Sequence, residues 1–414
     1  MFNLKELGQK AVLAKYELQA KTTEEKNSTL LCVADYLENR KQSILKANEE
    51  DIKRAELNGM HPGLVDRLRL DENRIAAMAE GLRQIVKLHD PVGEVMETFS
   101  PENGLVIQKK RVPLGVIGII YESRPNVTVD AFGLCFKTGN AVILKGGSDA
   151  IASNMAIAKV IRDALSDSGI TMDALQLIES CDRAVTAEFM KMKEYVDVLI
   201  PRGGAGLIRT VVENSNIPVI ETGTGNCHIY VDKDADLNMA VNIILNAKTQ
   251  RIGVCNACES LVLHEDIINE FLPLLNDALK EYHVEIRGDE KVGQVISCTP
   301  ATNEDYSMEY LDYILSAKTV SNVEEAIVHI NAHNTKHSEA IITENQNTAE
   351  VFLNGVDAAC VYVNASTRFT DGFEFGFGAE IGISTQKLHA RGPMGLKELT
   401  SYKYTILGKG HVRG

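Results

Sequence analysis

The sequence has no excess of positive charge, and this limits the partners that it can bind. Its 57 acidic residues outnumber its 43 basic residues, which gives a formal net charge of −14 at pH 7. Because such a chain is repelled by nucleic-acid phosphates and by anionic lipid surfaces, we exclude non-specific binding to either. A local basic pocket for a phosphorylated ligand stays compatible with this charge.

Long hydrophobic runs are also missing. No segment approaches the roughly 20 consecutive apolar residues that a membrane-spanning helix needs. The first residues, Met1 to Glu6, read as a polar helix start and contain no apolar core of a signal peptide. We therefore expect a cytoplasmic protein that does not associate with membranes.

The eight cysteines do not form a disulfide or zinc pattern. Cys255 and Cys258 are separated by two residues, but no second pair and no histidine set follows at zinc spacing. In a long chain without a secretion signal, scattered cysteines are typical of reduced thiols. We expect no metal site.

Helical periodicity dominates the first 90 residues of the chain. Apolar residues recur at three- and four-residue steps from Leu4 to Leu18, and Thr23, followed by two glutamates, is typical of a helix start. Asp90–Gly93 ends this pattern, and residues 97–112 then read as strand, turn and strand. This hairpin is either an ordinary surface hairpin or an arm that reaches another subunit.

Short apolar runs alternate with helical stretches over the rest of the chain, which predicts an α/β fold with parallel sheets. A chain of 414 residues is too long for one ordinary core, so we expect two or three domains. Residues 399–407 predict a terminal strand, whose edge would be covered by another subunit or by the hairpin. The expected internal strands lie at 114–120, 141–144, 175–178, 196–200, 218–220, 229–231, 261–263, 317–320, 339–342 and 360–363.

Four polar or glycine-rich loops follow expected strands, and such strand ends are where open α/β sheets bind ligands. Lys145, Gly146, Gly147 and Ser148 could place an ammonium and backbone N–H groups against a phosphate. Arg202, Gly203 and Gly204 form a second glycine turn. Although each alone could be a simple tight turn, two at neighbouring strand ends favour a dinucleotide site. The remaining loops are Tyr121–Asn126 and Ile220–Asn226.

Cys255 is the candidate nucleophile. It lies between small and amide residues and just before an apolar segment, although a free cysteine is often only a small buried hydrophobe. The thiolate is the reactive form, and an ordinary thiol with a pKa of about 8.5 is only slightly ionised at neutral pH. A site that uses Cys255 must therefore supply a helix N-terminus, a positive neighbour or a base.

These features, taken in order, resemble the aldehyde dehydrogenase superfamily. The resemblance covers essentially the whole chain and is strongest to the branch that reduces L-glutamyl 5-phosphate to glutamate 5-semialdehyde in proline biosynthesis. The motifs that carry it are Tyr121–Thr128, Glu221–His228, Val254–Glu259 and Val363–Phe369.

The resemblance implies an aldehyde dehydrogenase-like α/β fold of two parallel-sheet domains plus a small β oligomerisation element. Residues 1–225 would bind NADPH, interrupted by the hairpin 97–112, and residues 226–395 would carry the nucleophile. The hairpin and residues 396–414 would form the oligomerisation element of a homo-oligomer. An association with glutamate 5-kinase is also compatible with the resemblance.

The resemblance also assigns roles to single residues. Lys145 would contact the adenosine ribose or its 2′-phosphate, and Glu309 the nicotinamide ribose. Ser123 or Asn126 would hold the oxyanion, whereas Glu221, which activates water in hydrolytic members, would have no such task in a reductase. Five polar residues would face the carboxylate or phosphate of the substrate: Arg124, Asn364, Ser366, Thr367 and Arg368. Each of the two arginines could equally form a structural ion pair.

Two other functions stay open from the sequence. A coenzyme A-acylating aldehyde dehydrogenase would share the fold and Cys255 but would use coenzyme A in place of phosphate. A non-catalytic binding protein on this fold would keep the glycine loops and tolerate the loss of Cys255.

Overall fold

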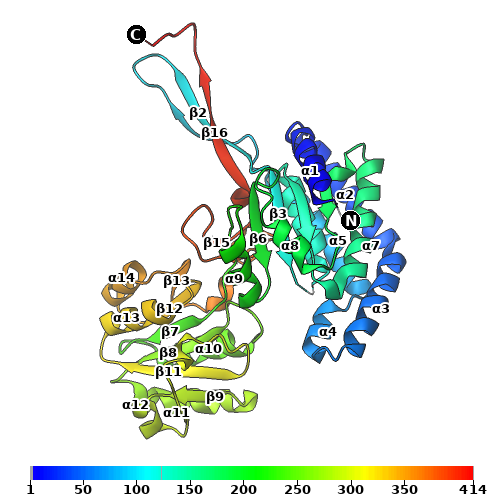
Figure 1. Cartoon of the computed structure of the whole chain (residues 1–414). Helices are drawn as coiled ribbons and strands as arrows, with labels where there is room; N and C mark the ends of the chain where they lie inside the picture. Colours follow the sequence, from blue (N-terminus) through cyan, green and yellow to red (C-terminus); the bar gives the residue numbers. More distant parts are fainter. Residues whose placement is uncertain (1–2, 123, 414) are drawn as a thin grey trace. The chain divides into compact units, whose positions relative to one another are not determined.

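The computed structural model describes residues 3–122 and 124–413, which form two compact units (Figure 1). The first unit runs to Glu221 and also takes in Gly376–Gly382 and the chain from Met394 onward. The second unit consists of Thr222–Phe375 and Ile383–Pro393. Each unit has its own parallel sheet, which confirms the expected α/β fold class.

The first unit is built on a four-stranded parallel sheet in the order β5-β4-β3-β6. Its strands are β3 (Val116–Tyr121), β4 (Ala141–Lys145), β5 (Leu175–Leu177) and β6 (Val198–Arg202). Its helices are α1 (Leu4–Gln19), α2 (Thr23–Asn39), α3 (Lys41–Leu57), α4 (Pro62–Leu68), α5 (Glu72–Lys87), α6 (Asn126–Lys137), α7 (Ile151–Asp167), α8 (Arg183–Phe189) and α9 (Ala205–Asn214).

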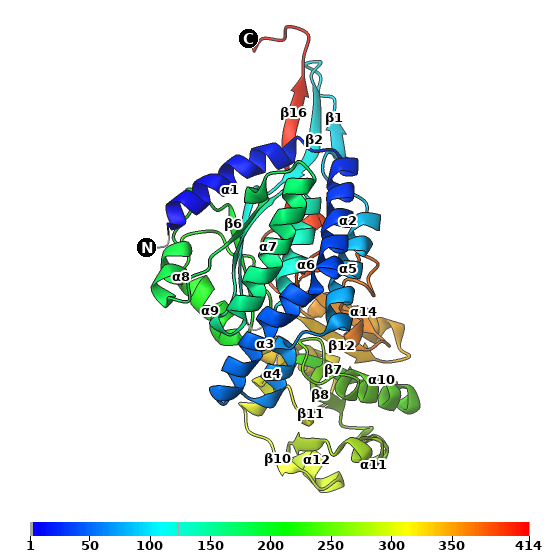
Figure 2. The same cartoon turned by 90° about the vertical axis from the view of Figure 1, so that its right-hand side faces the viewer.

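The helical character of the first 90 residues is confirmed, and the start of α2 shows why. Thr22 accepts a hydrogen bond from the N–H of Glu25, whose carboxylate accepts one from the N–H of Thr22. This reciprocal capping box satisfies backbone donors that the helix itself leaves unpaired. Figure 2 shows α2 lying beside α5 and α7, where its apolar face is buried.

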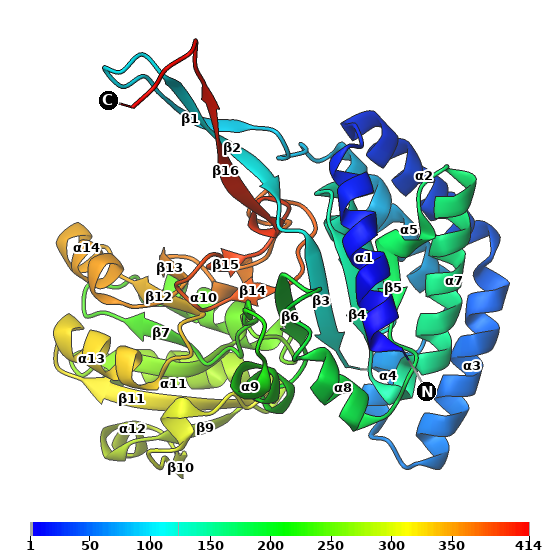
Figure 3. The ribbon, with the colours of Figure 1, turned by 45° about the horizontal axis from the view of Figure 1, so that its top comes forward.

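The hairpin and the terminal strand form a three-stranded antiparallel ribbon, which extends away from the helices of the first unit (Figure 3). Strands β1 (Val95–Phe99) and β2 (Val106–Pro113) form the hairpin. Strand β16 (Thr400–Leu407) pairs along the whole of β2, so the expected cover of the terminal strand by the hairpin is confirmed.

The second unit has a seven-stranded parallel sheet in the order β10-β9-β11-β8-β7-β12-β13. Its strands are β7 (Cys227–Val231), β8 (Cys258–His264), β9 (Glu285–Gly288), β10 (Thr299–Pro300), β11 (Ile314–Val320), β12 (Ser338–Ile342) and β13 (Cys360–Val363). Its helices are α10 (Leu237–Thr249), α11 (Ile268–Leu279), α12 (Glu290–Val295), α13 (Val323–His333) and α14 (Gln346–Gly355). The short strands β14 (Ile383–Ser384) and β15 (Gly392–Pro393) pair with each other.

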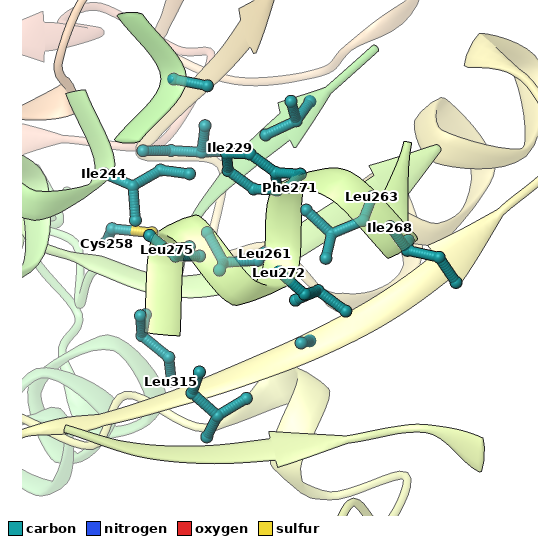
Figure 4. Packing of buried hydrophobic residues seen from close by; sticks show 14 of the residues in the cluster. Ile229, Ile244, Cys258, Leu261, Leu263, Ile268, Phe271, Leu272, Leu275 and Leu315 are labelled. Atoms are coloured by element: carbon teal, nitrogen blue, oxygen red, sulfur yellow. The ribbon is translucent and has the colours of Figure 1, made fainter. Parts of the chain in front are cut away.

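Two apolar cores cover the two faces of this sheet. On one face Ile229 and Leu261 pack with Phe271 of α11, as Figure 4 shows. On the other face the neighbouring residues Tyr230 and Val262 pack with helices α13 and α14. Because both faces of β7 and β8 are buried, their sequences read as nearly continuous apolar runs, which made these strands visible in the sequence.

Two features of the strands differ from what the sequence predicted. Residues 218–220 make a single bridge, Leu199 to Val219, and form no named strand. Strands β9 and β10 were not expected, because they are short and carry charged, glycine or proline residues in place of an apolar run.

Candidate active site

Cys255 lies in a turn that joins the end of α10 to the start of β8. The turn is closed by a hydrogen bond from the N–H of Ala257 to the carbonyl of Val254, with 3.1 Å between nitrogen and oxygen. Cys255 is half-buried, whereas Cys258, the first residue of β8, is fully buried. The turn precedes its strand, so the candidate nucleophile lies at the amino edge of the second sheet.

The carbonyl group of Cys255 is tightly packed against the start of β7. A Cβ atom added to Gly225 would lie 1.4 Å from the carbonyl oxygen of Cys255, so this approach requires glycine. The buried Cys227 Sγ lies 3.2 Å from the same oxygen and donates a hydrogen bond to it. The loop 222–226 therefore positions the backbone of the candidate nucleophile.

A positive neighbour for Cys255 is present in Arg368. The Arg368 guanidinium interacts electrostatically with Cys255, and burial, followed by the charge of Arg251, lowers the pKa of Arg368. Its Nε donates to Oε1 of Gln250 at 2.9 Å, which fixes the side chain. A fixed cation beside a thiol favours the thiolate, which the sequence analysis required of any site that uses Cys255.

The polar segment after β13 also holds the turn that carries Cys255. The buried Thr367 hydroxyl donates to the carbonyl of Asn256 at 2.7 Å. Asn256 Nδ2 donates to the carbonyl of Thr370 at 2.9 Å. Ser366 Oγ accepts from the N–H of Arg368 at 3.3 Å and begins the short helix Thr367–Phe369. Three of the expected substrate residues thus lie in one segment that contacts the nucleophile turn.

Asn364 has a different environment. It adopts a left-handed backbone conformation with φ of 54°. Its side-chain oxygen accepts from the N–H of Thr343, and its side-chain nitrogen donates to the carbonyl of Thr343, each at 2.9 Å. The Asn364 amide therefore joins the ends of two neighbouring strands.

Glu309 contacts the loop 222–226, which packs against the carbonyl of Cys255. Its Oε1 accepts a hydrogen bond from the N–H of Gly225 at 2.7 Å. Leu311, two residues further along the chain, has φ of 54° and donates its N–H to Oε1 of the buried Glu259 at 3.1 Å. The turn that carries Glu309 is thus anchored to the sheet.

In the first unit, Lys145 ends β4 and lies beside a glycine turn. Its Nζ donates to the carbonyl of Gly146 at 2.8 Å, and burial lowers its pKa. Among the described residues, the buried Nδ2 of Asn154 has no hydrogen-bond partner, and it would lie 2.2 Å from a Cβ on Gly146. Gly147 and Ser148 follow at the start of the short helix Ser148–Ala150. This group of donors suits a ribose hydroxyl or a phosphate.

The second glycine turn joins β6 to α9. Arg202 is the last residue of β6, and Gly203 and Gly204 lead into the helix. The N–H of Gly204 donates to Oε2 of Glu122 at 2.9 Å, so a carboxylate already lies at this helix start. The position fits the preference of helix N-termini for negative charge.

Four other candidate positions lie in the first unit. Asn126 begins α6, and its Nδ2 donates to Oδ2 of Asp130 at 3.0 Å. Arg124 is exposed in the loop before it, and Glu221 is the half-buried last residue of this unit's main segment. Ser123 lies outside the described residues.

Sequence reasoning missed the residues that hold the backbone of Cys255. Gly225 and Cys227 lie in a motif that was noted for its glutamate, and nothing in the sequence links them to Cys255. His337, which lies 3.8 Å from Cys227 Sγ through its Nδ1, carries no motif at all. Only the pairing of β7 with β8 and β12 brings these residues together.

No group of three or more metal-binding side chains was found in the part of the chain that the structure describes. Among the same residues, no helix is long and apolar enough to cross a membrane.

Comparisons with known proteins agree on one family. The aldehyde dehydrogenase family model matches residues 3–303. The chain is 62% identical to the γ-glutamyl phosphate reductase of Lachnospira eligens over 414 residues, which cover all of both chains. It is 56% identical to the Clostridium perfringens enzyme of that name over 407 residues, 98% of each chain.

Solved structures give the same result. The crystal structure of γ-glutamyl phosphate reductase from Thermotoga maritima matches with a TM-score of 0.98 and 50% identity, covering 100% of both chains. An acetylating aldehyde dehydrogenase from Geobacillus thermoglucosidasius matches with a TM-score of 0.71 and 17% identity, covering 99% of this chain and 97% of the other. At that identity the second likeness shows a shared fold alone.

Proposed function

The chain belongs to the aldehyde dehydrogenase family and, within it, to the γ-glutamyl phosphate reductases, and on this premise we propose that it reduces L-glutamyl 5-phosphate to L-glutamate 5-semialdehyde and phosphate. It would catalyse the second step of proline biosynthesis from glutamate. Membership of the family implies a nicotinamide cofactor, and we propose NADPH. The observation that carries the proposal is the half-buried Cys255 in a turn that is hydrogen-bonded to the segment carrying Thr367 and Arg368.

Acylation of Cys255 is the first step. The thiol of Cys255 releases its proton to solvent, and the thiolate, favoured by the positive charge of Arg368, attacks the γ-carbonyl carbon of the substrate. A carbon–sulfur bond forms, the bond from that carbon to the phosphate oxygen breaks, and phosphate leaves with the bonding electrons. Because an acyl phosphate is already activated, its departure requires little acid catalysis.

Reduction of the thioester is the second step. NADPH, when bound, supplies the hydride that brings the acyl group to the aldehyde level. The backbone N–H of Cys255 is the proposed donor to the oxyanion, which collapses to release the aldehyde and the thiolate. Asn126 and Ser123, the latter outside the described residues, are further candidates for donating a hydrogen bond to the oxyanion. Glu221 would have no water to activate, because the reduction involves no hydrolysis. Water must be excluded, since hydrolysis would waste the thioester.

The residues that would hold the cofactor are those of the two glycine turns. Lys145 would contact the adenosine ribose or its 2′-phosphate, because its ammonium and the Asn154 amide both lie beside Gly146. The N–H groups in the first turn of α9 would face a phosphate. Glu309 remains a candidate for the nicotinamide ribose, although Gly225 already occupies one of its oxygens. The set comprises Lys145, Gly146, Gly147, Ser148, Arg202, Gly203, Gly204 and Glu309.

Arg368 is the strongest candidate for binding the carboxylate or phosphate of the substrate, since a guanidinium contacts either anion through two parallel hydrogen bonds. Ser366 and Thr367 would shape the same segment, and Arg124 stays a candidate of the first unit. Asn364 would act indirectly, by holding the ends of β12 and β13 together, because its side-chain amide is hydrogen-bonded to the backbone of Thr343.

We also propose a homo-oligomer built through the ribbon of β1, β2 and β16. Several of its apolar side chains are exposed in the single chain, including Tyr402, Tyr404 and Ile406. Exposed apolar groups on an extended arm favour burial against another subunit. An association with glutamate 5-kinase would shorten the time that the labile acyl phosphate spends in water.

The reverse reaction tests the proposed function. Glutamate 5-semialdehyde, NADP and phosphate are supplied, and the absorbance of NADPH is followed. We expect turnover that requires phosphate and is lost in Cys255→Ala. Equal turnover with coenzyme A in place of phosphate, or full activity of Cys255→Ala, would refute the proposal. The same assay with NAD measures the cofactor preference.

A further inference from the structure

Cys227 is a second cysteine close to the nucleophile, and the reaction proposed above gives it no task. It is the first residue of β7 and is fully buried. Its Sγ lies 3.2 Å from the carbonyl oxygen of Cys255, in an arrangement in which the thiol is the donor. Burial, and then the charge of Glu339, raise the pKa of the Cys227 thiol well above its usual range. The group therefore keeps its proton at neutral pH and remains a donor.

The carbonyl of Cys255 is enclosed from two directions. Gly225 packs against it so closely that no side chain would fit there. Cys227, two residues later in the same segment, supplies a hydrogen bond to the same oxygen. The carbonyl can rotate away only if the start of β7 also moves. The peptide that follows the nucleophile is thus fixed, and with it the direction of the Cα–Cβ bond of Cys255.

A buried polar chain orients Cys227. His337 Nδ1 lies 3.8 Å from Cys227 Sγ and 2.8 Å from the hydroxyl of Ser338. That hydroxyl lies 2.7 Å from the hydroxyl of Thr370, whose carbonyl accepts from Asn256 Nδ2 at 2.9 Å. This series of contacts therefore begins at the Cys255 carbonyl, passes through Cys227, His337, Ser338 and Thr370, and ends at the side chain of Asn256 in the same turn.

We infer that Cys227 is a positioning residue, which holds the Cys255 carbonyl through its thiol and thereby orients the nucleophile for attack. The inference rests on the proposed role of Cys255. Loss of the donor would loosen the turn without removing any group that touches substrate or cofactor. Since displacement of a reacting group by about 1 Å can cost orders of magnitude in rate, a looser turn lowers kcat and leaves KM nearly unchanged.

Four substitutions in the full chain test the inference. Cys227→Ala removes the donor, and Cys227→Ser restores one in nearly the same place. Cys258→Ala is the matched control, because it also removes a fully buried thiol at the start of a neighbouring strand. The Cys258 Sγ lies 3.6 Å from the carbonyl of Ser260 and, among the residues that the structure describes, donates no hydrogen bond to the turn. Cys227→Val, which fills the site without a donor, is measured as well, so that a folding failure of the alanine variant leaves the test intact.

The measurements are kcat and KM in the reverse assay, and hydrogen exchange of the amides of residues 254–256. We expect kcat to fall by about three- to tenfold in Cys227→Ala and Cys227→Val, the effect of one hydrogen bond, with KM within about twofold. Exchange should accelerate by a similar factor. Cys227→Ser and Cys258→Ala should keep more than about half of kcat and the exchange rate of the parent chain.

The inference is overturned if kcat and exchange are unchanged in the variants that lack the donor. It is equally overturned if Cys258→Ala falls as far, or if Cys227→Ser fails to restore kcat. Failure of the proposed function is distinguishable from these outcomes, because the parent chain itself would then show no phosphate-dependent turnover, whereas the exchange rates would still report whether Cys227 holds the turn.

Discussion

The carboxylate of Glu309 accepts a hydrogen bond from the N–H of Gly225, with 2.7 Å between the two atoms. Gly225 in turn packs against the carbonyl of Cys255. The turn that carries Glu309 is anchored through Leu311 to the buried Glu259. The Glu309 carboxylate, which was expected to bind the cofactor, therefore also supports the loop 222–226 that packs against Cys255.

Replacement of Glu309 separates these two tasks. Glu309→Ala removes the acceptor of the Gly225 N–H, and a hydrogen bond to a charged group contributes about 1.5–3 kcal/mol, which predicts a fall in kcat of about tenfold or more. Glu309→Gln keeps an oxygen acceptor and should retain most of kcat. Steady-state measurement of kcat and of KM for NADP checks this. A rise in KM alone would show that Glu309 acts only on the cofactor.

Gly225→Ala should strongly impair catalysis. The new Cβ would lie 1.4 Å from the Cys255 carbonyl oxygen, so the turn must shift. We expect kcat to fall by at least about a hundredfold, because the nucleophile is displaced. The control is Gly293→Ala in α12, whose Cβ would lie 3.8 Å from Cys298 Sγ, an ordinary van der Waals distance. Retention of activity by Gly225→Ala, or an equal loss in the control, would contradict the prediction.

The sequence predicted the elements better than the site. Apolar runs such as Leu261–Leu263 are visible because both faces of the strand are buried, whereas Glu285–Gly288 pairs at the side of the sheet with charged side chains and gives no such signal. Cys255 could be proposed as the nucleophile from its motif. The contacts of Cys227 with Cys255 and His337 could not, because they join residues 28 and 110 positions apart that only strand pairing brings together.

The roles of polar residues were also hard to predict from the sequence. Arg368 was expected to contact substrate, and the structure adds that its segment is hydrogen-bonded to the turn that carries Cys255. Asn364 belongs to the same motif, yet its amide is bound to the backbone of Thr343. A motif gives the residue types of a site, but the side-chain direction depends on the local backbone, here a φ of 54° at Asn364.

Breaking the buried ion pair between Lys248 and Glu259 by removing one partner should strongly destabilise the chain. Their side chains are fully buried, with 2.6 Å between Nζ and Oε2, and burial raises the pKa of Glu259 to about 7. Removing one partner of a buried pair costs about 3–5 kcal/mol, so Lys248→Met should lower the urea midpoint markedly. Adding Glu259→Gln should recover part of the loss, because no charge then stays buried alone.

The exposed pair Lys280–Asp277 supplies the control for this measurement. Its side chains are about three-quarters exposed, at 75% and 76%. Such pairs contribute little, so Lys280→Met should leave the urea midpoint unchanged. A midpoint as low in Lys280→Met as in Lys248→Met would show that the effect does not come from the buried pair.

The ribbon makes a prediction about assembly. Tyr404 and Ile406 are 52% and 59% exposed on β16, where they extend from the body of the first unit. The double substitution Tyr404→Lys and Ile406→Lys should shift the particle toward a monomer in light scattering, since charges oppose burial of this surface. Lys403→Ala on the same strand is the control and should leave the mass unchanged. An unchanged mass in the double variant would show that the ribbon does not form the contact between subunits.

His329 packs among other ionisable groups in the second unit. Its ring lies against those of Tyr306 and His333, with centroids 5.1 and 4.6 Å away. Burial, followed by the charges of His228, His333 and Lys318, lowers its pKa to about 3. Among the described residues, its buried Nε2 has no hydrogen-bond partner. The folded chain therefore keeps His329 neutral where the unfolded chain would protonate it.

This depressed pKa predicts a loss of stability in acid. An unfolded histidine titrates near pH 6.5, so between about pH 6.5 and 3 the unfolded chain binds a proton that the folded chain excludes. The free energy of unfolding is therefore unaffected above this window, and within it falls by up to about 1.4 kcal/mol for each unit by which the pH decreases. His329→Gln should flatten the dependence of the urea midpoint on pH between 7 and about 4.5, whereas replacement of the exposed His411 by glutamine should not. Parallel curves for the parent chain and His329→Gln would mean that His329 is protonated in the folded state as readily as in the unfolded one.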